Sequence, residues 1–134
     1  CIICCANSSH GKNISKADYI AAHHAVVIFG SDRRPDYPGL YFEFEGIERN
    51  ISLRMPSYAS VPKTIIGSDL LATVPLQLAL GWQEPMPIKI FPSPIKIPNM
   101  TVSVQWHRLR KSDKALICLI DTLVKHAKDI SNHD

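Results

Sequence analysis

The sequence predicts an α/β fold, and three observations support that prediction. The chain has 134 residues, the size of one compact domain or of part of a larger one, since domains typically hold roughly 100 to 200 residues. Short runs rich in β-branched residues recur, and most are apolar throughout, as in the strands of a sheet that helices cover on both faces. Helix-like or turn-rich stretches separate these runs, which is the order of elements in α/β proteins.

The composition is globular and excludes some classes of protein. Hydrophobic residues make up 46% and charged residues 20% of the chain, which is enough apolar material for a packed core. A net charge of +3 is too small for a nucleic-acid-binding surface. No apolar run approaches the roughly 20 residues that cross a bilayer, and residues 1–6 are too short for a signal peptide. We therefore expect a soluble, cytoplasmic protein without membrane contact.

The cysteines are Cys1, Cys4, Cys5 and Cys118. Cys4 and Cys5 are adjacent in an apolar run, and no second CxxC or His-x-His spacing follows to complete a metal site. We therefore expect buried reduced thiols, no metal and no cofactor. Because the first residue is Cys and not Met, we also expect the chain to be a fragment of a longer one.

The predicted strands are short apolar runs bounded by turn residues. They are 1–6, 25–29, 51–55, 70–74, 88–91 and 101–106. The segment 85–98 carries five prolines, a density that central strands do not tolerate because proline donates no ladder hydrogen bond. This segment is predicted to be an extended edge or a connector.

Short helices are predicted between these strands. Ser15-Lys16-Ala17-Asp18 resembles a capping box and begins a short helix that ends near His23 and His24. A second helical turn is expected over 40–44, closing at Gly46, with Pro35 and Pro38 keeping the residues before it out of a regular helix interior.

Three more helices follow in the second half of the chain. One is expected over 58–67 with Gly67 as its stop, and another over 75–80, ended by Gly81. The clearest helix starts at the N-cap Ser112. Its apolar positions recur at helical spacing and form one face that must pack on something; they are Leu116, Leu119, Ile120, Leu123, Val124 and Ala127.

The residue patterns of common enzymes are incomplete in this sequence. It has no Gly-x-Ser-x-Gly elbow and no Gly-rich phosphate loop, and we interpret Ser68 as a loop or capping residue. His23 and His24 are adjacent, so on a helix they diverge by about 100° and do not readily share a metal. His107 is a candidate general base, but no carboxylate is placed beside it by the local pattern.

A candidate binding edge lies where the strand 51–55 turns into the next helix. Pro56, Ser57 and Tyr58 occupy this junction. Open α/β sheets bind small ligands at the carboxyl ends of their strands, where a helix begins. Tyr58 is equally consistent with a residue that only covers the edge of the core, and the sequence leaves both interpretations open.

Several segments resemble LysR-type transcriptional regulators. The stretch 50–58 leading into Val61-Pro62, and then 66–75, is similar to one stretch of that family, while 105–108 with Ser112-Asp113 and an amphipathic helix is similar to its terminus. The Trp106-His107 pair resembles the nodulation-regulator and aromatic-responsive subgroup. The resemblance runs essentially from end to end. The sequence departs from the family at Pro35, Pro38 and Lys114, and over 117–119.

The resemblance implies a Rossmann-like effector domain of the periplasmic-binding-protein type. Residues 1–97 would form mainly its second subdomain. Residues 98–134 would hold the return crossover, the last strand and the C-terminal helix, which belong to the first subdomain. The N-terminal DNA-binding domain and most of the first subdomain would lie outside this chain, so contact with DNA would occur only through the absent part.

The function implied by the resemblance is effector sensing, without catalysis. A small, aromatic or carboxylated inducer would bind in the cleft between subdomains, and the full-length protein would be a homo-oligomer, a dimer or tetramer. We place Phe29, Gly30, Pro56, Ser57 and Tyr58 at this effector site. Ser57 would donate to a carboxylate, and Phe29 and Tyr58 would stack on a ring.

Two alternative functions remain open on the sequence alone. One is a small α/β enzyme that uses His107 or Ser68, and the other is an interaction module without a ligand. The last helix adds a hypothesis about association: its wide apolar face needs a partner surface, so this chain alone is expected to expose that face and to oligomerise or aggregate.

Overall fold

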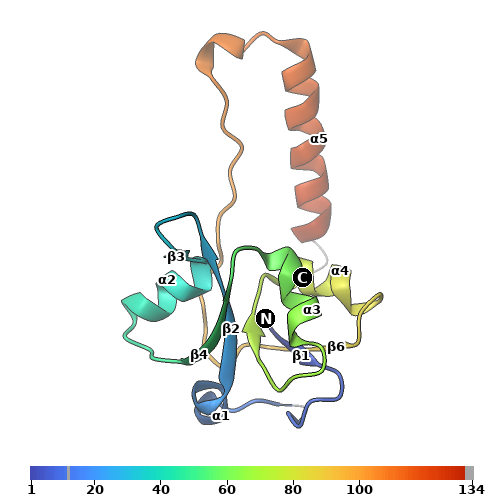
Figure 1. The fold of residues 1–134 in the computed structure, drawn as a ribbon. Helices are drawn as coiled ribbons and strands as arrows, with labels where there is room; N and C mark the ends of the chain where they lie inside the picture. Colours follow the sequence, from blue (N-terminus) through green and yellow to red (C-terminus); the bar gives the residue numbers. More distant parts are fainter. Residues whose placement is uncertain (12, 132–134) are drawn as a thin grey trace. The chain divides into compact units, whose positions relative to one another are not determined.

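The computed structural model describes residues 1–11 and 13–131 and has a mixed α/β fold, as predicted (Figure 1). It divides into two compact units, Cys1–Asn99 and Met100–Asp134. The division falls close to the boundary expected after residue 97. Whether the two units belong to two subdomains of one regulator stays a prediction.

The first unit contains two small sheets. In one, β1 (Ile2–Cys5) is the central strand and pairs antiparallel with β5 (Ala72–Thr73) and β6 (Ile88–Phe91). β6 comes from the proline-rich segment and lies at the edge of this sheet, as the sequence predicts. In the other, β2 (His23–Phe29) pairs antiparallel with β3 (Arg34–Pro35).

The third strand of the second sheet is β4 (Asn50–Met55), which runs parallel to β2. The two sheets meet at Leu71, which forms a parallel bridge with His24. Here the Ala25 N–H donates to the Leu71 carbonyl, and the Leu71 N–H donates to the His23 carbonyl, each at 2.9 Å. The two sheets therefore continue into one another through the residue that precedes β5.

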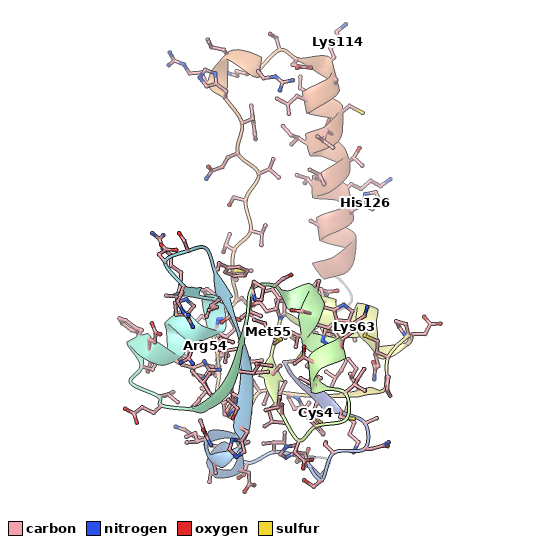
Figure 2. All side chains as sticks on the ribbon, viewed as in Figure 1. Cys4, Arg54, Met55, Lys63, Lys114 and His126 are labelled. Carbon is pink, nitrogen blue, oxygen red and sulfur yellow. The ribbon has the colours of Figure 1, made fainter. Side chains whose placement is uncertain are left out.

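β1 is apolar throughout because apolar residues cover both of its faces, whereas β4 carries Asn50, Ser52 and Arg54 and is largely exposed. Ile3 belongs to one core cluster, while its neighbours Ile2 and Cys4 belong to another, as expected when successive side chains point to opposite faces of a sheet. Met55, which Figure 2 labels, lies at the end of β4 and belongs to the first cluster with Val61.

Five short helical segments join the strands of the first unit. They are α1 (Lys16–Ala21), α2 (Tyr37–Phe44), the 3-10 turn η1 (Tyr58–Ser60), α3 (Val61–Ile65) and α4 (Leu76–Gln83). α2 and α3 are followed by Gly46 and Gly67, both with positive φ, a conformation that costs glycine little. These two helix ends agree with the sequence prediction.

Two helix ends in the first unit differ from the prediction. α1 stops at Ala21 because the backbone of Ala22 is extended, so His23 and His24 begin β2 instead of ending a helix. Gly81 lies inside α4, which runs on to Gln83. Gly81 lacks the positive φ of a helix-ending glycine, and an isolated glycine in a helix costs only about 1 kcal/mol relative to Ala.

The second unit consists of an extended segment, the 3-10 turn η2 (Arg108–Arg110) and α5 (Lys114–Ser131). The strand predicted over 101–106 is wrong, since these residues have no regular secondary structure. A strand needs a hydrogen-bonded neighbour, and no strand is assigned among the described residues from 100 to 131. α5 itself is confirmed, and Figure 2 labels Lys114 and His126 along it.

The N-cap of α5 is Asp113, not the predicted Ser112. Its Oδ1 accepts from the backbone N–H groups of Ala115 at 3.0 Å and Leu116 at 3.2 Å. The Arg110 guanidinium donates to Oδ2 at 2.6 Å and, with the bond from Leu116, holds the pKa of Asp113 below its ordinary value. Aspartate is as good an N-cap as serine, so the sequence offered two adjacent caps.

No described helix is long and apolar enough to cross a membrane.

Candidate functional site

The predicted site residues emerge at one edge of the second sheet. β2 and β4 are neighbouring parallel strands, and Val27 lies opposite Met55 in their register. Their carboxyl ends therefore lie side by side. Phe29 ends β2, while Pro56 leads from β4 into η1 and α3. Figure 2 marks this junction by Met55 on β4 and Lys63 on α3.

Phe29 and Tyr58 meet at this edge. Their ring centroids are 6.1 Å apart with an angle of 65° between the ring planes, which is the edge-to-face geometry that aromatic pairs favour. Phe29 keeps 44% of its surface exposed, whereas Tyr58 is half-buried. The two rings form an aromatic pair, and its solvent-exposed surface comes mainly from Phe29.

Gly30 follows Phe29 and starts the turn to β3. Its φ is +70°, and a Cβ atom built on it would lie 2.7 Å from the Asp32 carboxylate. The Arg33 N–H donates to the Gly30 carbonyl at 3.3 Å and closes the turn. Gly30 therefore contributes to this edge of the sheet through the turn conformation of its backbone.

Ser57 is the N-cap of η1. Its Oγ accepts from the Ala59 N–H at 3.1 Å, and its carbonyl accepts from the Ser60 hydroxyl at 2.7 Å. The side chain is exposed. Ser57 thus has a structural role that its position at a strand-to-helix junction indicated, and it remains accessible to a ligand.

The structure adds Asp36 to this group, a residue that the sequence analysis did not single out. Asp36 is buried at 4% exposure and caps α2, because its Oδ1 accepts from the Gly39 N–H at 2.9 Å. Its Oδ2 accepts from the Tyr58 hydroxyl at 2.7 Å. Asp36 therefore ties the start of α2 to the junction after β4.

A signal for Asp36 was present in the sequence. Asp followed within two residues by Pro is a common start of a helix, because Asp caps it and Pro fits its first turn. Pro38 lies in the first turn of α2, so this proline, which was expected to lie before the helix, marks where the helix begins, while Pro35 ends β3.

Burial and hydrogen bonding act in opposite directions on this pair. Burial raises the pKa of Asp36 above its ordinary value, while the bonds from Tyr58 and Gly39 and the nearby Arg49 oppose that rise. The pKa of Tyr58 is raised strongly, first by burial and then by the Asp36 carboxylate. The phenol of Tyr58 therefore stays protonated and keeps its hydrogen bond across the physiological pH range.

A large hollow of the first unit lies beyond Asp36, next to α2. It has a volume of about 510 Å³ and includes Asp36 and Phe42 in its lining. Three arginines line it together with two glutamates; these are Arg33, Arg49, Arg54, Glu43 and Glu48. None of the predicted site residues Phe29, Gly30, Pro56, Ser57 and Tyr58 contributes to its wall. Asp36 lines the hollow and also accepts the hydrogen bond from Tyr58 at the predicted edge.

The residues proposed for an enzyme have structural partners. The Ser68 hydroxyl donates to the Ile65 carbonyl at 2.8 Å and accepts from the Leu70 N–H at 3.3 Å, which agrees with its interpretation as a loop or capping residue. His107 is the N-cap of η2, and its Nδ1 accepts from the Leu109 N–H at 3.2 Å. Ser68 belongs to the first unit and His107 to the second.

The cysteines are free thiols, but not all are buried. Cys4 and Cys5 lie in the core, Cys1 is partly buried, and Cys118 on α5 is exposed, which corrects the expectation for that residue. The Ser8 hydroxyl lies 3.1 Å from the Cys4 sulfur. In the part of the chain that the structure describes, no three His, Cys, Asp or Glu residues gather as metal ligands do.

Comparison with known proteins finds relatives among transcriptional regulators. The chain is 30% identical over 127 residues to nodulation protein D 3 of Rhizobium leguminosarum bv. phaseoli, with 95% of this chain and 42% of that protein covered. It is 26% identical over 132 residues to nodulation protein D 1 of Mesorhizobium japonicum, covering 98% of this chain and 42% of the relative. The chain thus spans less than half the length of these relatives. No protein-family model matches it.

Solved structures show the same fold. The probable transcriptional regulator PA0477 of Pseudomonas aeruginosa matches with a TM-score of 0.62 and 20% identity, covering 72% of this chain and 32% of that one. The regulatory domain of MexT, a transcriptional activator of the same organism, matches with a TM-score of 0.54 and 24% identity, covering 71% and 47%. The chain is similar in sequence to nodulation D regulators over nearly its whole length, and its fold is that of the regulatory domains of LysR-type regulators.

Proposed function

We propose that this chain is the effector-sensing portion of a LysR-type transcriptional regulator. The observation that supports this most directly is the edge where β2 and β4 end together and present Phe29, Ser57 and Tyr58. Ligands of open α/β sheets bind at such edges. The exposed surface of the aromatic pair could stack on a flat ring, and the Ser57 hydroxyl could donate to a carboxylate or another acceptor.

The proposed mechanism is a shift between conformations, without any bond being broken. A ligand that contacts both lobes of an effector domain favours the hinge angle at which it binds more tightly. In the proposed regulator, that angle is passed to a dimer or tetramer and changes how the protein holds DNA. The DNA contact would come from a part of the regulator outside this chain, and the protein would work in the cytoplasm.

Relatives that regulate transcription argue against an enzyme. The geometry of Ser68 points the same way, because its hydroxyl is committed to the backbone after α3. A nucleophile would instead need a base within hydrogen-bond reach.

Replacing Ser57 tests the proposed edge. Ser57→Ala removes one hydrogen bond to a bound carboxylate, so the effector concentration for half-maximal response in the intact protein should rise about tenfold, which corresponds to about 1.4 kcal/mol. The response is measured with 4-hydroxybenzoate and related benzoates by ligand titration and a transcription reporter. Tyr58→Ala should reduce both the response and the melting temperature, because the ring also packs.

The neighbouring Ser60 provides a matched control. Ser60→Ala also removes a hydrogen bond of η1, the one to the Ser57 carbonyl, yet Ser60 is not part of the proposed edge. Its response should therefore stay at the level of the original protein. An unchanged response in both Ser57→Ala and Tyr58→Ala would show that the effector binds elsewhere.

A further inference from the structure

The hydrogen bond between Tyr58 and Asp36 has a defined direction. An ionised carboxylate only accepts hydrogen bonds, and both oxygens of Asp36 are in use: Oδ1 accepts from the Gly39 N–H at 2.9 Å and Oδ2 from the Tyr58 hydroxyl at 2.7 Å. The phenolic hydrogen of Tyr58 is therefore committed to Asp36. The Tyr58 oxygen keeps only its capacity to accept a hydrogen bond.

The neighbouring Ser57 has the opposite polarity. Its Oγ already accepts from the Ala59 N–H, and its hydroxyl hydrogen has no acceptor among the described residues. Two adjacent hydroxyl groups at the same edge thus differ in what they present, because Tyr58 presents an acceptor and Ser57 a donor. This difference is produced by Asp36, which is buried and fixed as the cap of α2.

We propose that Asp36 is a specificity-determining positioning residue, which makes Tyr58 a hydrogen-bond acceptor and so selects an aromatic ligand with a free hydroxyl group facing Tyr58. This inference rests on the proposed effector site. The ligand's acceptor group, such as a carboxylate, would then face Ser57. A methyl ether in place of the hydroxyl group would have no hydrogen to give to Tyr58, so O-methylated compounds would be discriminated against.

Rigid placement supports this role. The Asp36 carboxylate is held by the Gly39 N–H, and a Cβ atom on Gly39 would come within 2.9 Å of Asp36 Oδ1. The Tyr58 ring also contacts Phe29 in edge-to-face geometry. A group held in place before binding loses little freedom on binding, so the direction of the Tyr58 hydroxyl can discriminate between ligands.

The test uses two probes that differ in one methyl group, 4-hydroxybenzoate and 4-methoxybenzoate. Titration of the intact protein should show about tenfold tighter binding of the hydroxyl compound, a ratio equivalent to about 1.4 kcal/mol. In Asp36→Asn, the amide oxygen should keep the Gly39 bond and the amide hydrogens should face Tyr58. The phenolic hydrogen of Tyr58 is then released toward the ligand, and because the hydroxyl and the methoxy oxygen both accept it, the preference should largely disappear.

Two further variants separate this role from a structural one. Tyr58→Phe removes the hydroxyl group and should bring the two probes to nearly equal affinity. Ser57→Ala should weaken both probes by a similar factor and leave their ratio unchanged. If Asp36→Asn and Tyr58→Phe both keep the original ratio while still binding the probes, the inference about Asp36 is wrong and the proposed site stands.

A spectroscopic measurement tests the Asp36–Tyr58 bond without a ligand. With tyrosines labelled at Cζ, carbon NMR should show that Tyr58 ionises at a clearly higher pH than free tyrosine, which ionises near pH 10. In Asp36→Asn, Tyr58 should ionise at lower pH because the carboxylate charge is gone. Ordinary ionisation of Tyr58 in the original protein would overturn the inference even if Asp36→Asn does not fold. Failure of both probes to bind would count against the proposed function itself.

Discussion

His24 is a histidine that the interior of the first unit holds in its neutral form. The side chain has no exposed surface, and its Nε2 lies 2.7 Å from the Tyr19 carbonyl, so Nε2 carries the hydrogen and donates. Nδ1 has no hydrogen-bond partner among the described residues. Burial is the main cause that lowers the pKa of His24 to about 4; the bond to Tyr19 opposes this shift, and electrostatic interactions with Arg49, His23 and His10 add to it.

Acid should therefore destabilise the fold through His24. The His24 imidazole binds a proton near pH 6.5 in the unfolded chain but only near pH 4 in the folded chain. The contribution of neutral His24 to the free energy of unfolding is therefore fully present above pH 6.5 and is lost as the pH falls toward 4. At about 1.4 kcal/mol per pKa unit, the loss amounts to roughly 3 kcal/mol. Urea unfolding at a series of pH values measures it.

The variant His24→Leu isolates this effect. It should lower stability at pH 7, because the Tyr19 carbonyl loses its donor, but it should remove most of the slope between pH 6.5 and 4. Asp36 works in the opposite direction, since its raised pKa lets the folded state take up a proton first. A slope that stays the same in His24→Leu would assign the acid sensitivity to other groups.

At the scale of single residues, the sequence predicts positions better than environments. The junction of Pro56, Ser57 and Tyr58 with the end of β2 follows from strand order and a parallel sheet. The burial of His24 does not, because it depends on where α1 stops, and one extended residue, Ala22, decides that. The pairing of Asp36 with Tyr58 joins residues 22 positions apart, and no local pattern specifies such a contact.

Among the helices, α2 shows how closely capping and packing depend on each other. Gly39 lies in its first turn, where a Cβ atom would come within 2.7 Å of the Pro35 Cβ and 2.9 Å of Asp36 Oδ1. The absence of a side chain at this position lets the Asp36 carboxylate reach the Gly39 N–H. The cap of α2 and the Tyr58 bond thus both depend on a glycine.

Gly39→Ala should therefore destabilise the fold by about 1 to 3 kcal/mol, the usual cost of overpacking. Gly81→Ala is a matched control, because Gly81 lies inside α4 and a Cβ atom added to it would meet nothing within 4 Å. It should stabilise the protein by up to about 1 kcal/mol through helix propensity. Denaturant midpoints of the two variants give the comparison, and a neutral Gly39→Ala would mean that α2 shifts without cost.

The elements that the sequence predicts well are those with local signals. Positive-φ glycines end α2 and α3, and helical spacing of apolar residues predicts α5. The strand expected over 101–106 fails for a different reason: β-branched residues favour a strand only where a neighbouring strand pairs with them. The fold class was predictable from the sequence because it depends on many such signals together, whereas single strands depend on their partners.

At the scale of the whole molecule, the apolar face of α5 is an exposed surface of the second unit. Its residues Leu119, Leu123 and Val124 are 55%, 46% and 42% exposed, which agrees with the expectation that this helix shows its apolar face in the isolated chain. Contiguous apolar patches of this kind favour association in water.

The isolated chain should therefore elute as an oligomer or as aggregates in size-exclusion chromatography with light scattering. The double change Leu119→Glu with Leu123→Glu should shift it toward the monomer, because charges oppose burial of the patch. Thr122→Glu, a charge at another position of the same helix, should leave the distribution unchanged. A well-behaved monomer of the original chain would contradict the prediction.

The meeting of the two sheets at Leu71 has a mechanical consequence. β1 and β6 are held by four residue pairs in register, whereas β2 and the segment before β5 are joined at the single bridge between His24 and Leu71. With a single backbone bridge at this seam, the cohesion of the two sheets depends mainly on the apolar core that they share, which includes Ile3 of β1 and Val27 of β2.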